Sequence, residues 1–139
     1  MEPVKLVYPV EGGDLIEAGE ASSKMKLTLK KLGLPPDVIR RASICMYEGE
    51  INMVIHADGG RVEVDVGMDA ITLRLIDHGP GIPDVNQAME EGFSTAGAVA
   101  RDLGFGAGMG LPNMKRYSDE MRIDTTVGVG TTVTMKIRI

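Results

Sequence analysis

The spacing of apolar residues along the chain changes period twice. Residues 4–10 alternate between apolar and polar, which predicts a strand, and Pro9 suggests that this strand lies at a sheet edge. Apolar residues then recur three and four positions apart, which predicts one helix over 14–32, capped by Asp14, and a second over 37–57. Gly33 closes the first of these helices, and Asp58-Gly59-Gly60 ends the second.

After residue 60 the pattern returns to period two. Segments 61–66 and 71–75 alternate and predict an antiparallel hairpin. Residues 78–108 have no sustained period, and a loop of this length in a small domain is usually functional or mobile. A short helix follows, from Gly108 or Gly110 to about residue 119, and a last hairpin pairs 121–125 with 132–139. The order of these elements indicates an α+β two-layer sandwich with helices on one face of a sheet.

Composition narrows the class of protein. The 139 residues are 43% hydrophobic, which suits a single domain over residues 1–139. A net charge of −5 argues against a general nucleic-acid or anionic-membrane binder. We see no apolar run long enough for a membrane span and no signal segment. The single cysteine, Cys45, excludes an intrachain disulfide framework and fits the reducing cytoplasm.

Glycine is in excess of what a core requires, and its distribution is uneven. The chain has 18 glycines and an aromatic content of 4%. More than half of the glycines lie in three clusters of the C-terminal half, namely Gly79 and Gly81, then Gly92, Gly97, Gly104, Gly106, Gly108 and Gly110, and finally Gly128 and Gly130. Such clusters, separated by ordinary sequence, are typical of a site built from several loops and not of a linker.

Glu48 and Asn52 form the first candidate site, because a spacing of four places both side chains on one face of a helix. A carboxylate beside a carbonyl oxygen can hold a hydroxyl or water together with a hard metal ion. Two polar residues on a solvated helix face are the simpler interpretation of this pair. Asp77 is the second candidate, since it ends a predicted strand before Gly79 and Gly81, where it could accept a hydrogen bond from an amine such as that of adenine. An ordinary turn after a strand explains the same residues.

A third candidate is the alternation of glycines in residues 104–111, just before a helix. Exposed backbone amides and a helix N-terminus favour phosphate there. The spacing is neither that of a P-loop nor that of a Rossmann fingerprint, and a flexible hinge is the alternative. Gly128-Val129-Gly130-Thr131, taken alone, reads as a hairpin turn.

The order of these motifs resembles the N box and three G boxes of the Bergerat-fold (GHKL) ATPases, which include gyrase B, a heat-shock chaperone, histidine-kinase catalytic domains and MutL. The resemblance covers residues 35–139 and implies a histidine-kinase-like ATPase fold with a mixed, mostly antiparallel sheet. Segments 88–97 and 110–116 look closest to the small bacterial anti-sigma factors and serine kinases, in particular the stressosome-type switch kinase. One departure is an insertion at 98–103, which lengthens the loop.

The resemblance implies a role for each motif. Asp77 would bind the adenine amine with Thr131 and Gly81, Asn52 would coordinate Mg²⁺ through ATP, and Glu48 would be the catalytic base. The complete set of residues implied to bind ATP is Asn52, Asp77, Gly79, Gly81, Ile82, Gly106, Gly108, Met109, Gly110, Leu111 and Thr131. Residues 83–105 would form a lid that closes over ATP.

Three functions remain open at this point. The resemblance favours a cytoplasmic serine/threonine-protein kinase that transfers the γ-phosphate of ATP to a STAS-domain regulator of transcription. The alternatives are an anti-sigma factor that sequesters a sigma factor according to the bound nucleotide, and an ATP-gated interaction module with little catalysis. Direct nucleic-acid or membrane partners are not expected, and a homodimer is possible by analogy with the anti-sigma branch.

Overall fold

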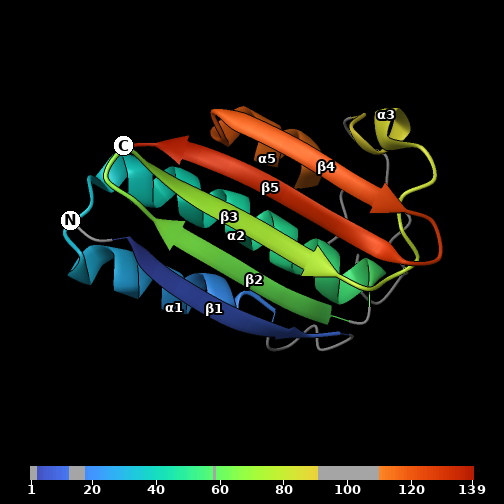
Figure 1. Cartoon of the computed structure of the whole chain (residues 1–139), viewed down its shortest axis with the longest axis horizontal. Coiled ribbons are helices and arrows are strands. Elements are labelled where there is room, and N and C mark those ends of the chain that lie inside the picture. Colours follow the sequence, from blue (N-terminus) through green and yellow to red (C-terminus); the bar gives the residue numbers. More distant parts are fainter. Residues whose placement is uncertain (1–2, 13–17, 58, 91–109) are drawn as a thin grey trace.

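A five-stranded antiparallel sheet forms one layer of the protein, and helices pack on one of its faces. The computed structural model describes residues 3–12, 18–57, 59–90 and 110–139. Figure 1 shows α1, α2 and α5 on the same side of the sheet. The strands run in the order β1-β2-β3-β5-β4. The described elements are β1 (Val4–Glu11), α1 (Glu20–Lys31), α2 (Pro36–His56), β2 (Gly59–Val66), β3 (Ala70–Asp77), α3 (Val85–Ala88), α5 (Gly110–Tyr117), β4 (Glu120–Thr126) and β5 (Gly130–Arg138).

The expected two-layer α+β sandwich is confirmed, with one refinement. All four pairings between the described strands are antiparallel, so the parallel pair that a mixed sheet would contain is absent from this part of the chain. Period two accounts for the two faces of the sheet. Val62, Val64 and Val66 are fully buried beneath the helices, whereas Arg61 and Glu63 of the same strand form an ion pair on the opposite face.

Helix α2 is the central helix and lies against the middle of the sheet. Pro36 occupies its first turn, where the missing N–H costs no hydrogen bond. Gly49 allows the close approach, because a β-carbon there would stand 2.0 Å from the Leu75 side chain. Cys45 is fully buried, as its helical position predicts, and its thiol donates to the carbonyl of Met114 in α5 at 3.6 Å. Burial raises the pKa of this thiol to about 12, so Cys45 belongs to the core.

The predicted start of the first helix is wrong. Helix α1 begins at Glu20, and its N-cap residue is Gly19, with φ +97°. Asp14, the predicted cap, lies outside the described residues. The free amides of α1 instead donate to a distant carboxylate, that of Glu50 in α2, which accepts from the backbone N–H groups of Gly19 and Ser22 at 2.9 Å each. A non-local cap of this kind leaves no local sequence signal.

Three smaller differences concern the ends of elements. Gly59 and Gly60 do not end α2 but open β2, where they pair with Glu11 and Val10. The short helix α3 was not expected; the side chain of Asp84 caps it by accepting from the backbone N–H of Gln87 at 3.0 Å. Helix α5 starts at Gly110, which is one of the two predicted starting residues, and it ends at Tyr117.

No helix in the described ranges is long and apolar enough to cross a membrane.

Candidate functional site

A polar row crosses the sheet at the end where β3 finishes, on the face that the helices cover. Leu75, Val133 and Ile123 are cross-strand neighbours in β3, β5 and β4 and belong to the core or pack against it. Two residues further along each strand, the same face carries Asp77, Thr131 and Thr125. Side chains two apart share a face, so the apolar row and the polar row are consecutive layers. The core therefore stops at this row, and hydrogen-bonding groups take its place.

Asp77 is held in a fixed orientation by the backbone. Its Oδ1 atom accepts from the N–H of Gly79 at 2.9 Å and from the N–H of Thr131 at 3.2 Å. Within the part of the chain that the structure describes, both bonds reach Oδ1, which leaves Oδ2 as an acceptor for a ligand. This geometry suits recognition of a donor such as an exocyclic amine.

Glycines allow the loops around Asp77 to pack closely. A β-carbon at Gly81, where φ is +80°, would stand 2.6 Å from the backbone oxygen of Thr126. A β-carbon at Gly130 would stand 2.2 Å from the backbone oxygen of Asp77. The N–H of Gly128 donates to the carbonyl of Pro80 at 2.8 Å across the same contact. Gly81 and Gly130 thus allow the loop after β3 to pack against the last hairpin, and a larger residue at either position would separate the two.

A second group of site residues lies where α2 meets α5. Glu48 and Asn52 are both half-buried on α2. A β-carbon at Gly110, the first residue of α5, would stand 2.9 Å from Nδ2 and 3.1 Å from Oδ1 of Asn52. Asn113 of α5 donates from Nδ2 to Oε1 of Glu48 at 3.3 Å. The structure therefore brings the predicted carboxylate and amide to the N-terminus of a helix, the end at which backbone amides favour an anion.

Two residues of this site escaped the sequence analysis. Asn113 holds the Glu48 carboxylate, and Thr125 contacts Thr131 from the neighbouring strand. Asn113 follows Gly110 at the i+3 position, so the predicted helix already placed it near the start of α5. Thr125 could have been found by pairing the predicted hairpin in register, because it is the cross-strand partner of Thr131.

The remaining predicted residues divide into three groups. Gly106, Gly108 and Met109 lie outside the described residues, as does most of the predicted lid at 83–105. The Leu111 side chain is 8% exposed within the core, so its backbone amide is the part available to a ligand. Ile82 is half-buried, and its backbone N–H donates to the hydroxyl of Thr125 at 2.9 Å.

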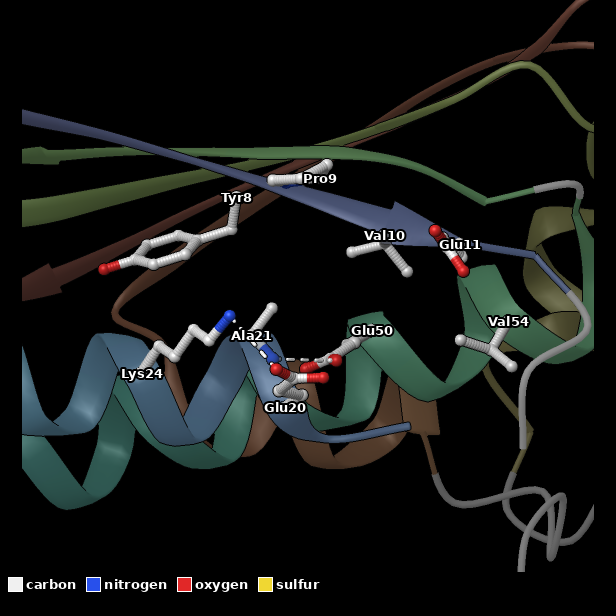
Figure 2. Close-up of a pocket in the computed structure, with 9 residues that line it drawn as sticks. All are labelled: Tyr8, Pro9, Val10, Glu11, Glu20, Ala21, Lys24, Glu50 and Val54. Atoms are coloured by element: carbon white, nitrogen blue, oxygen red, sulfur yellow. Dashed lines mark hydrogen bonds and ion pairs between the residues drawn. The ribbon is translucent and has the colours of Figure 1, made fainter. Parts of the chain in front are cut away.

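A separate hollow of about 290 Å³ lies between β1 and the helices α1 and α2, and it contains none of the predicted site residues. Figure 2 shows Glu50 and Glu20 at its floor with Lys24 beside them. The carboxylate of Glu50 accepts from groups of α1, and Lys24 pairs with Glu20 at 3.0 Å. The charged groups of this hollow therefore interact with other groups of the protein. Both hydrogen bonds of Asp77 described above reach Oδ1, so its Oδ2 differs in being left as an acceptor for a ligand.

Comparison with known proteins agrees with this geometry. The family model described as histidine kinase-, DNA gyrase B- and HSP90-like ATPase matches residues 39–139. The chain belongs to this GHKL ATPase family. The domain that defines the family binds ATP, and the matched residues include every described residue of the predicted site.

Curated relatives place the chain within one branch of the GHKL family. It is 33% identical over 108 residues to the serine/threonine-protein kinase RsbT of Bacillus subtilis (strain 168), covering 75% of each chain. It is 31% identical over 106 residues to an anti-sigma F factor of Clostridium beijerinckii, covering 72% of this chain and 71% of the relative. An anti-sigma F factor of Caldanaerobacter subterraneus is 34% identical over 109 residues, with 73% of each chain covered. The expected branch of anti-sigma factors and serine kinases is thereby confirmed.

Proposed function

We propose that this chain is a serine/threonine-protein kinase that transfers the γ-phosphate of ATP to a hydroxyl group of a STAS-domain regulator. The observation that carries the proposal is the meeting of Glu48, Asn52 and Gly110 where α2 reaches the N-terminus of α5. A carboxylate within reach of a phosphate site is what transfer to a hydroxyl requires. Similarity to a protein named as a serine/threonine kinase supports the same activity.

The proposal assigns roles to the residues around Asp77 and at the start of α5. Oδ2 of Asp77 accepts from the adenine amine, and Gly81 lets the ring approach the backbone. The backbone amides at Gly110 and Leu111, at the N-terminus of α5, bind phosphate oxygens. Asn52 offers a carbonyl oxygen to Mg²⁺, which would neutralise phosphate charge when bound. The carbonyl oxygen of Asn52 fits such an ion, and the neighbouring helix N-terminus fits the phosphates through which the ion would be held.

The chemical step is a balanced transfer. Glu48 accepts the proton of the attacking serine or threonine hydroxyl as its oxygen bonds to the γ-phosphorus. The bond from that phosphorus to the bridging oxygen of ADP breaks, and ADP leaves with the electron pair. Positioning and charge neutralisation supply most of the rate enhancement in phosphoryl transfer, so the single base suffices.

A second function is favoured by the anti-sigma relatives. The chain shares more than 70% of its length with two anti-sigma F factors, so sequestration of a sigma factor is the alternative main activity. In that case phosphorylation would act as the release switch. Both functions place the protein in the cytoplasm, where transcription occurs.

Purification from native cells with bound partners distinguishes these functions. The mixture is given Mg²⁺ and ATP, and the phosphorylated residue is identified by mass spectrometry. We expect a phosphoserine or phosphothreonine on a STAS-domain protein, lost by about 100-fold or more in Glu48→Ala. Glu120→Ala, which removes an exposed carboxylate of β4, is the matched control. Recovery of a sigma factor with no phosphorylated STAS protein would favour the alternative.

A further inference from the structure

Thr125 lies at the centre of a hydrogen-bond network that no ligand contact explains. Its Oγ1 atom accepts from the backbone N–H of Ile82 at 2.9 Å and lies 2.8 Å from Oγ1 of Thr131. A weaker contact at 3.4 Å joins the same atom to the carbonyl oxygen of Gly130. Thr125 is half-buried and joins three segments, namely β4, β5 and the loop that follows β3. The next residue, Thr126, is exposed.

The directions of these bonds follow from what each group can donate. A backbone N–H can only donate, so Ile82 occupies one acceptor position of the Thr125 hydroxyl. The single hydroxyl proton of Thr125 has two acceptors nearby, Oγ1 of Thr131 at 2.8 Å and the carbonyl oxygen of Gly130 at 3.4 Å. The contact with Thr131 can run in either direction. The contact with Gly130 is longer than the usual range of O–H···O hydrogen bonds, so Thr131 is the acceptor at normal distance from the Thr125 proton. When Thr125 donates, one lone pair of Thr131 is occupied and the proton of Thr131 points away from Thr125.

We propose that Thr125 is a positioning residue for base recognition, which holds the Thr131 hydroxyl as a hydrogen-bond donor beside Asp77. The inference rests on the proposed nucleotide site and concerns its selectivity. Asp77 and Thr131 are cross-strand partners, so an acceptor and a donor stand side by side. Adenine presents the complementary pair, an amine donor and the N1 acceptor. Hypoxanthine presents the reverse, an O6 acceptor and an N1–H donor, and is therefore rejected twice.

Loss of the Thr125 hydroxyl weakens this discrimination. In Thr125→Val the Thr131 hydroxyl is free to rotate and can accept from the N1–H of hypoxanthine. We expect ADP to bind about tenfold more weakly and IDP affinity to stay nearly unchanged, so that the ratio of ADP to IDP affinity falls about tenfold. Calorimetric titration of the full chain with ADP and with IDP measures both constants.

Three variants make the test specific. Thr125→Ser keeps the hydroxyl and should retain the wild-type ratio, and Thr126→Val makes the same chemical change at the exposed neighbour and should be neutral. Thr125→Ala also removes the hydroxyl, and it replaces Thr125→Val in the test if the valine variant melts below the assay temperature. The inference is overturned when both removals keep the wild-type ratio, or when Thr125→Ser loses it equally. Failure of the wild-type chain to bind ADP would instead overturn the proposed function.

Discussion

Two carboxylates on α2, two residues apart, have opposite fates. Glu50 faces α1, is 3% exposed, and accepts four hydrogen bonds from Gly19, Ala21 and Ser22. Glu48 faces α5, is half-buried, and among the described residues accepts a hydrogen bond from Asn113. The oxygens of Glu50 are occupied by hydrogen bonds that hold α1 to α2, whereas those of Glu48 can still accept hydrogen bonds from a ligand. The difference teaches that burial and charge alone do not distinguish these two carboxylates, whereas the hydrogen bonds that each already accepts do.

The largest effect should come from removing the structural carboxylate. Glu50→Ala leaves buried amides of α1 without acceptors, so we expect the free energy of unfolding to fall by about 3 kcal/mol. Glu48→Ala, the matched change on the other side of α2, should cost less than about 1 kcal/mol. Urea denaturation followed by circular dichroism measures both values. Equal losses of stability would remove the distinction between the two carboxylates.

A smaller effect is expected from crowding the α5 side of the helix. In Gly110→Ala the added methyl group would stand about 3 Å from the amide of Asn52 and displace it. Alanine favours a helix over glycine, so stability should hold or rise slightly, while the affinity for Mg-ATP falls about tenfold. Gly67→Ala, in an uncrowded turn, is the control. Calorimetry with unchanged affinity would contradict the placement of the phosphate site.

The smallest effect concerns Asp119, a third carboxylate, which is partly exposed just before β4 and lies beside the last residues of β5. Its Oδ2 accepts from the N–H of Arg138 at 2.7 Å and from the guanidinium of Arg41 at 3.1 Å. These contacts hold the pKa of Asp119 below its ordinary value of 3.8. Its contribution to stability is therefore complete above that value and is lost as the pH falls through the lowered pKa.

Asp119→Asn tests this pH dependence. At pH 7 the substitution should cost about 1 kcal/mol or less, because solvent screens the pair. The cost should shrink as the pH drops below about 4, where the wild-type carboxyl also begins to lose its charge. Asp69→Asn, in the exposed turn between β2 and β3, serves as the control. A cost that stays constant down to acid pH would show that the charge of Asp119 contributes nothing.

Periodicity was sufficient to predict most of the fold. Alternation over 61–66 and 71–75 identified the central hairpin, and Gly33 marked the end of the first helix. The start of α1 could not be predicted, because the group that caps it, Glu50, is 31 residues away from Gly19. Helix α3 did leave a signal, since Asp84 and Gln87 have the spacing of a capping motif.

Those residues of the candidate site that belong to a sequence motif could be predicted. Residues that join the site through contacts between distant segments were harder to predict. Glu48, Asn52 and Asp77 were found from spacing and from the order of the glycine clusters. Asn113 and Thr125 contact the predicted residues Glu48 and Thr131, so recognising them required knowing which segments meet. A row of polar residues that ends an apolar layer is a tertiary feature, visible once the register of three strands is known.

Nucleotide recognition by Asp77 is the central claim, and calorimetric titration of Asp77→Asn with ADP tests it most directly. Asparagine keeps the size of the side chain and can keep an oxygen toward the amides of Gly79 and Thr131, which then leaves a donor facing the adenine amine. We expect ADP binding to disappear while the melting temperature changes little. Undiminished affinity for ADP in a folded Asp77→Asn protein would contradict the account.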